Sequence, residues 1–134
     1  MQTAEFLALA QLLSGPDGPH PQGRHRSAVS RSYYYAFLEA RQRLASVPHI
    51  AIPRKNAHDV VWKAMAWAAP PLKSAGRLLK DLKALRERAD YDLDPDLGHA
   101  DVLEAIRIAN DIRRTLESAD MSQCVDPNRG PTKP

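Results

Sequence analysis

Apolar residues recur at helical spacing in five separate segments of this 134-residue chain. A spacing of three or four residues places such side chains on one face of a helix, whereas a half-buried strand needs strict alternation. The segments cover residues 2–14, 28–45, 56–68 and 71–91, and a last one that starts between His99 and Asp101. The apolar stripes of the first, second, fourth and fifth segments are Phe6, Leu9, Ala10 and Leu13; Val29, Tyr33, Phe37, Ala40 and Leu44; Ala75, Leu78, Leu79, Leu82, Leu85 and Ala89; and Val102, Ile106, Ala109, Ile112 and Leu116.

Helix breakers and capping residues separate these segments. Residues 14–21 hold three prolines and two glycines and predict a mobile connection, and two prolines make residues 47–53 a loop. Ser27 and Asn56 are suited to cap the second and third helices, and Pro71 to open the fourth, whose first turn Gly76 slightly weakens. Asp101 and Glu104 have the spacing of a capping box.

The pattern predicts an all-α fold, an antiparallel bundle of four to five helices over residues 1–119. Residues 120–134 show no periodicity and are expected to form a disordered tail. A chain of this length is one domain by size. Its single cysteine, Cys124, cannot close an internal disulfide, and no secretory leader or membrane-spanning run is evident. These features favour a cytoplasmic protein without a membrane partner.

The net charge of +3 is unevenly distributed. Residues 20–56 carry seven Arg or Lys and one Glu, and residues 69–91 carry six basic and three acidic groups. Residues 92–119 carry three basic and seven acidic groups. A basic surface suits a phosphate-bearing partner such as RNA or a nucleotide. The alternative is a solvated surface on which basic and acidic parts lie together in the fold.

The strongest candidates for a functional site lie together near the end of the fourth helix: Arg86, Arg88, Asp90 and Tyr91. Arg86 and Asp90 are four apart on a helix and can form an ion pair. A guanidinium beside a carboxylate and a phenol can hold a phosphate or orient a 2′-hydroxyl. The same pair, with a phenol packed on a neighbouring helix, can equally serve only to stabilise the bundle.

The candidates for nucleic-acid binding are Arg88 of the fourth helix and a set on the second helix: Arg26, Arg31 and Tyr34, with Ser30 beside them. The three consecutive tyrosines from Tyr33 to Tyr35 cannot all be buried on one helix, so one or two should face a cleft, a partner chain or solvent. Tyrosines with arginines can stack on bases and hold phosphates, and they are equally suited to a dimer interface. Trp62 and Trp67 are expected to serve packing, one in the core and the other on a flank.

Two of these segments, RSAVSRSYYYAFLEAR at residues 26–41 and LRERADYD at residues 85–92, resemble the HEPN superfamily of small helical bundles in its stand-alone prokaryotic branch. The resemblance implies a helical bundle and a homodimer, and it leaves three functions open. The first is a toxin-like or defence-associated protein that binds RNA or a nucleotide phosphate, or cleaves RNA without a metal. The second is a non-catalytic partner of a nucleotidyltransferase antitoxin, and the third is a purely structural dimerisation module. It places the reactive polar residues on the helix that carries Arg86, Asp90 and Tyr91.

The sequence departs from the nucleolytic HEPN pattern at one point. Nucleolytic relatives carry a histidine four to six residues after the arginine, and none follows Arg86 or Arg88 in that window. His58, which opens the third helix, is the candidate acid or base if it approaches that site, and otherwise is satisfied within the bundle. The other histidines, His20, His25, His49 and His99, are expected to be exposed, and no metal or cofactor is expected.

Overall fold

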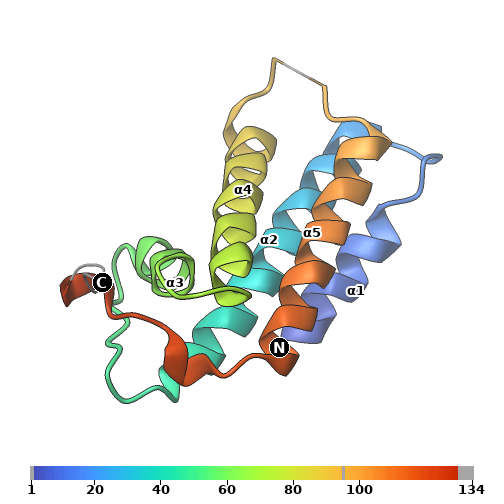
Figure 1. Cartoon of the computed structure of the whole chain (residues 1–134). Helices are drawn as coiled ribbons and strands as arrows, with labels where there is room; N and C mark the ends of the chain where they lie inside the picture. The colour runs from blue at the N-terminus through green and yellow to red at the C-terminus, as the bar shows by residue number, and fades with distance from the viewer. Residues whose placement is uncertain (1, 95, 130–134) are drawn as a thin grey trace.

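The structure is a computed structural model that describes residues 2–94 and 96–129, and within them every regular element is a helix. In chain order these are α1 (Thr3–Leu13), α2 (Pro21–Ala45), α3 (Ala57–Ala66), α4 (Leu72–Tyr91) and α5 (His99–Ser118), followed by two short 3-10 helices, η1 (Met121–Gln123) and η2 (Pro127–Arg129). The helices α1, α2, α4 and α5 lie side by side in an up-and-down arrangement, and α3 lies across one end next to α4 (Figure 1). The predicted all-α antiparallel bundle is confirmed.

The helix α2 is the centre of the bundle, because it contacts each of the other four long helices. All five residues of its predicted apolar stripe are buried. Tyr35 is also buried, at 3% exposure, where α1 and α5 cover that side of α2. Only Tyr34 of the three tyrosines is half-buried. The expectation that one or two of them face outward therefore holds for Tyr34 alone, because α2 is surrounded on more sides than a helix at the edge of a bundle.

The helix α2 begins seven residues before its predicted start at Ala28. Pro21 occupies its first position, where the missing N–H costs nothing, so Ser27 lies inside the helix and caps nothing. The guanidinium of Arg24 donates to the carbonyls of Gly15 (2.8 Å), Gly18 (3.2 Å) and Pro19 (2.8 Å), which braces the connection from α1. His25, expected to be exposed, is buried and donates through Nδ1 to the carbonyl of Leu97.

The helices α3 and α4 pack unusually closely. Gly76, in the first part of α4, faces the backbone of α3, and a Cβ at this position would lie 2.6 Å from the carbonyl oxygen of Trp62 and overlap the amide nitrogen of Ala66. Glycine is therefore required here for a close approach of two helices. The predicted start of α3 after Asn56 is confirmed, but the Asn56 side chain makes no capping hydrogen bond. The helix ends at Ala66, two residues before the predicted end.

The segment after α5 packs against the bundle as far as it is described. Cys124 is 2% exposed, its carbonyl accepts from His49 Nε2 (2.7 Å), and the Val125 N–H donates to the Ala64 carbonyl (2.9 Å). The expectation of a disordered tail is thus wrong for residues 120–129, because irregular backbone can be held by single contacts that leave no periodic pattern. Residues 130–134 of the expected tail lie outside the described residues.

The start of α5 at His99 lies within the predicted range, whereas its capping residues differ from the predicted pair. The Asp101 carboxylate accepts from the Gly98 N–H at 2.8 Å. Asp101 thus supplies the acidic member of the cap from the first turn and is not the cap residue itself. Of the helices described, none is long and apolar enough to cross a bilayer. Within the same residues, no three His, Cys, Asp or Glu side chains gather as a metal site would require.

Candidate functional site

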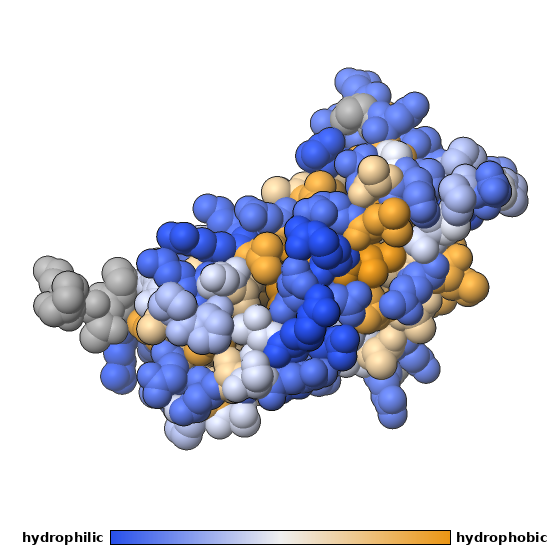
Figure 2. Space-filling view, turned by 45° about the vertical axis from the view of Figure 1, so that its right-hand side comes forward, coloured by the Kyte–Doolittle hydropathy of each residue, from blue (hydrophilic) through white to orange (hydrophobic). Residues whose placement is uncertain are grey.

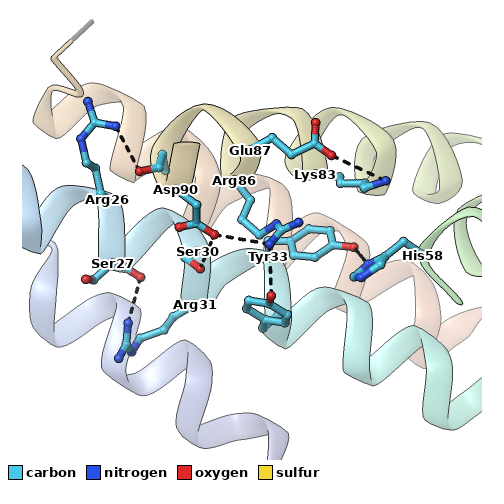
Figure 3. Close-up of polar contacts among 12 residues, drawn as sticks. Arg26, Ser27, Ser30, Arg31, Tyr33, His58, Lys83, Arg86, Glu87 and Asp90 are labelled. Atoms are coloured by element: carbon cyan, nitrogen blue, oxygen red, sulfur yellow. Dashed lines mark hydrogen bonds and ion pairs between the residues drawn. The ribbon is translucent and has the colours of Figure 1, made fainter. Parts of the chain in front are cut away.

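Five side chains from three helices meet on one side of α2, and we call them the Arg86 cluster: Tyr33 and Tyr34 from α2, His58 from α3, and Arg86 and Asp90 from α4 (Figure 3). Arg86 and Asp90 share one face of α4 at i, i+4 spacing, and the rings of Tyr33 and Tyr34, which are adjacent on α2, both lie beside the Arg86 guanidinium. The close packing of α3 on α4 places His58 beside the Tyr33 hydroxyl. The structure therefore brings together three residues predicted from α3 and α4 as site residues, and one predicted from α2.

The Arg86 guanidinium is held within the protein. It is 9% exposed, and its Nη1 donates to the Tyr34 hydroxyl (3.1 Å) and to Asp90 Oδ2 (3.3 Å). The guanidinium carbon lies 5.3 Å from the Tyr33 ring centre, 5.4 Å from that of Tyr34 and 5.9 Å from that of Tyr91. Burial opposes the charge, but Tyr34 and Asp90 outweigh it, so the pKa of Arg86 is raised. The cation is fixed by two hydrogen bonds and stacked rings.

Arg86 nevertheless keeps unused hydrogen-bonding capacity. Its Nε is buried without a hydrogen-bond partner among the described residues. A buried N–H without a partner costs free energy, and such a donor is an explicit exception to the usual pairing of buried polar atoms. The cluster is thus not fully satisfied by its own side chains.

His58 is hydrogen-bonded through Nδ1 to the Tyr33 hydroxyl, and its ring stacks on Phe37 with centroids 4.3 Å apart. Burial lowers the pKa of His58 from its usual value, and the nearby charges of Lys83 and Arg86 lower it further. Burial also raises the pKa of Tyr33 well above its usual range. The phenol therefore keeps its proton and donates it to Nδ1, which leaves the proton of the neutral imidazole on Nε2.

Lys83 lies at the rim of the cluster on α4. Its ammonium nitrogen is 3.6 Å from Glu87 and 3.9 Å from Asp59, and its side chain is 27% exposed. Both carboxylates are about half exposed, so these ion pairs are weak and readily exchanged for another anion. Lys83 is thus the cation of this region that an incoming anion reaches without breaking a buried contact.

The remaining predicted site residues do not join the cluster. Arg26 Nη1 donates to the carbonyls of Arg88 (3.1 Å), Ala89 (3.0 Å) and Asp92 (2.6 Å), so this side chain caps the end of α4. Arg31 donates to the Ser27 carbonyl of its own helix and points toward α1, away from the cluster (Figure 3). Arg88 is exposed on α4. Tyr91 is 75% exposed and contacts the cluster only through its ring beside Arg86.

Sequence reasoning assigned Tyr33 to the core, and its burial at 1% exposure agrees. Its side chain, however, links two parts of the cluster: the hydroxyl bonds His58, and the ring lies beside the Arg86 guanidinium. Periodicity shows that a tyrosine is buried but not which polar partner its hydroxyl meets on another helix. Lys83 was also missed, because one lysine in a basic helix carries no distinguishing signal.

Comparison with protein-family models, curated proteins and solved structures found no match for this chain. The resemblance to the HEPN superfamily therefore rests on the segments at residues 26–41 and 85–92 alone. Four of the five members of the Arg86 cluster lie in those two segments, namely Tyr33, Tyr34, Arg86 and Asp90, whereas His58 lies outside them.

Proposed function

We propose that this chain is a HEPN-like protein that binds RNA or a nucleotide phosphate at the open edge of the Arg86 cluster. The observation that carries the proposal is the convergence of an imidazole and two cations: His58 bonds the Tyr33 hydroxyl, Arg86 lies 5.3 Å from the centre of the Tyr33 ring, and Lys83 lies 3.9 Å from Asp59, the neighbour of His58. Phosphate oxygens are bound by such N–H donors and positive charges. Lys83 would meet the phosphate first, because Arg86 is already held by Tyr34 and Asp90.

The proton positions favour binding over cleavage. Cleavage without a metal needs a base to take the proton of the 2′-hydroxyl as its oxygen attacks the adjacent phosphorus and the bond to the 5′-oxygen breaks. The Tyr33 hydroxyl occupies Nδ1 of His58, so the other nitrogen, Nε2, carries a proton and acts as a donor. A donor suits a phosphate oxygen and not a hydroxyl proton. We therefore place ribonuclease activity second to binding.

The test is fluorescence anisotropy of a labelled single-stranded RNA with wild type, Lys83→Gln and the control Arg114→Gln. Arg114 lies on α5, where it pairs with Asp111. We expect binding that weakens with rising salt, because each neutralised phosphate releases counterions. Lys83→Gln should reduce affinity, and Arg114→Gln should not. Absence of binding at low salt, or equal losses in the two variants, would refute a phosphate site at this cluster.

A parallel incubation of RNA in EDTA tests cleavage. Wild type is expected to leave the RNA intact. Cleavage that is abolished in a folded His58→Ala variant, as judged by circular dichroism, would show that His58 acts as a base and would replace binding with ribonuclease activity as the function.

A different class of function, a protein-interaction module, is favoured by the surface of α1. This helix carries one charged residue, Glu5, and is apolar nearly all round. Leu12 is 79% exposed, and an apolar hollow of about 350 Å³ is lined by Glu5, Ala8, Leu9 and Leu12. Figure 2, in which the α1 and α5 side comes forward, shows apolar residues gathered beside a strongly polar band. An apolar helix surface of this kind is normally buried against another part of the protein or against a partner.

We propose that a second copy of the chain covers α1, since the resemblance implies a homodimer and the face is nearly free of charge. The shared contact would then lie at α1 and not at the largely buried tyrosines of α2. Light scattering should give twice the 14.9 kDa monomer mass, and Leu12→Glu should give the monomer. If the wild type stays monomeric at every protein concentration but binds a co-expressed nucleotidyltransferase, the partner is the antitoxin instead.

A further inference from the structure

Both tryptophans of the chain line one surface hollow, which we call the tryptophan hollow. Its volume is about 370 Å³, and its walls are Trp62, Ala66, Trp67, Lys73, Arg77 and Lys80. Both indole rings are half-buried, so the expectation that one fills the core is wrong. Trp67 directly follows the last residue of α3 and keeps a helical backbone conformation, with its N–H donating to the Lys63 carbonyl (2.9 Å). It lines the same hollow as Trp62.

The hollow is a product of how closely α3 and α4 approach. Gly76 lies against Trp62 and Ala66 of α3, Arg77 follows it directly, and Lys80 lies one turn further along α4. A larger residue than glycine would push the two helices apart and separate the indoles from these cations. The hollow is therefore fixed by backbone packing and not by mobile surface side chains.

Four cations surround the indole rings: Lys63, Lys73, Arg77 and Lys80. The Lys63 ammonium lies 5.7 Å from the Trp62 ring and 5.9 Å from the Trp67 ring, and that of Lys80 lies 4.9 Å from Trp62. None of the four forms an ion pair with another described residue. Their charges are thus not neutralised within the described part of the chain.

The nearest acidic groups do not cancel this charge. Asp59 accepts a hydrogen bond from Trp62 Nε1 at 3.2 Å and lies 3.9 Å from Lys83, on the side toward the Arg86 cluster. Asp81 is exposed on α4 and makes no ion pair with Arg77, although the two are four residues apart. The hollow keeps an excess of positive charge around two aromatic faces.

We propose that the tryptophan hollow binds single-stranded RNA, with bases stacked on Trp62 and Trp67 and phosphates on Lys73, Arg77 and Lys80. Cations that track a backbone beside aromatic rings that stack on bases are the arrangement by which proteins hold single strands without reading sequence. Lys80 now covers Trp62 by a cation–π contact, which at an exposed site is weaker than base stacking. A base can therefore take the ring face while the ammonium moves to the phosphate.

The hollow and the Arg86 cluster lie along one path. Lys83 approaches Asp59, and Asp59 bonds Trp62, so the same strand can pass from the rim of the cluster onto the indoles. The hollow extends the proposed function by naming a second contact site and the single-stranded form of the ligand. It rests on that function only in the choice of RNA as the ligand.

The test uses the full chain and a fluorescein-labelled twelve-nucleotide oligouridine, with two readouts. Anisotropy of the label reports binding anywhere on the protein. Tryptophan fluorescence reports the hollow alone, because the chain has two tryptophans and both line it. We expect the oligouridine to quench tryptophan fluorescence over the same concentration range in which anisotropy rises.

Two kinds of variant then separate charge from stacking. Arg77→Gln/Lys80→Gln should lower the slope of log Kd against log salt by roughly 1.4, since each phosphate contact to a single strand contributes about 0.7. The control Arg107→Gln/Arg114→Gln removes the same charge from α5 and should leave the slope unchanged. Trp62→Leu should raise Kd roughly 5- to 150-fold. If the Trp62→Leu protein does not fold, Trp67→Leu replaces it as the test and should raise Kd by a similar factor.

Each unfavourable outcome has a distinct meaning. Anisotropy that rises without quenching, or equal slope changes in both double variants, overturns the hollow and leaves RNA binding in place. Poly-glutamate that quenches as well as oligouridine also overturns it, because an acidic peptide would then account for the cations without base stacking. No rise in anisotropy at low salt removes both the hollow and the proposed function.

Discussion

Replacement of Gly76 by alanine sets two physical effects against each other. In an exposed helix, alanine is favoured over glycine by about 1 kcal/mol, so the sequence alone would expect Gly76→Ala to stabilise α4. In the structure, the added Cβ would lie 2.6 Å from the Trp62 carbonyl oxygen and 2.7 Å from Ala66 Cα. These are backbone atoms, which cannot rotate away as a side chain would.

The size of the effect follows from that geometry. The contact with the Trp62 oxygen must lengthen from 2.6 Å to at least 3.4 Å before it becomes an ordinary van der Waals distance. Such overpacking typically costs about 1–3 kcal/mol, and a clash with backbone on a whole helix belongs at the upper end. With the gain in helix propensity of about 1 kcal/mol subtracted, we expect Gly76→Ala to lower the free energy of unfolding by about 2 kcal/mol.

Urea denaturation followed by circular dichroism measures this difference, with an unchanged slope as evidence of the same transition. Gly23→Ala in α2 is the matched control, because a Cβ there would meet only the His20 side chain at 4.0 Å. It should be stabilised by up to about 1 kcal/mol. A Gly76→Ala protein as stable as wild type, beside a Gly23→Ala protein that behaves as expected, would show that α3 and α4 are not in close contact.

Three further predictions concern the cap, the imidazole and the thiol. Arg26→Ala should cost about 1–2 kcal/mol in urea denaturation and increase hydrogen exchange at the end of α4, because three carbonyls lose their donor; Arg26→Leu with no loss would contradict the cap. Because the pKa of His58 is lowered by folding, the unfolded chain takes up a proton at higher pH than the folded one does. The free energy of unfolding should therefore fall as pH drops below about 6.5, and fall less in His58→Gln. An NMR titration midpoint for His58 at or above that pH would refute this prediction. Burial raises the pKa of Cys124 to about 11, so its reaction with a thiol reagent at pH 8 should be roughly 100-fold slower than in urea, and equal rates would show that residues 120–129 do not pack.

The apolar pattern was sufficient to predict the helices that pack by a continuous stripe. The ends of α4 and the buried face of α2 agree with it, because burial of every third or fourth residue is what holds those helices in place. The pattern could not predict residues 21–27 as helical, since that turn contributes no apolar stripe. Its support comes from Pro21 at the first position and from hydrogen bonds of Arg24 and His25 to distant carbonyls.

The candidate site was only partly predictable for a related reason. The Arg86–Asp90 pair is local to one helix, and its four-residue spacing is visible in the sequence. The contacts of His58 with Tyr33, and of Arg26 with the end of α4, join segments far apart in the chain. They depend on how the helices are rotated against each other, which no spacing within one helix fixes. The hollow between Trp62 and Trp67 was missed because residues five apart do not share a helical face by spacing, and because its other wall comes from α4.

The central place of α2 has a consequence for synthesis of the protein in the cell. Its apolar and aromatic side chains emerge from the ribosome with only α1 made before it, whereas α4 and α5 follow over roughly 70 further residues. At ribosomal rates of about 5–20 residues per second, the interval lasts about 4–15 s. During that time the nascent chain exposes the very surface that later becomes the core. Demand for chaperones should therefore be set by how fast residues 46–118 are translated, so that synonymous codons which slow this stretch would lower the yield of folded protein without changing a single amino acid.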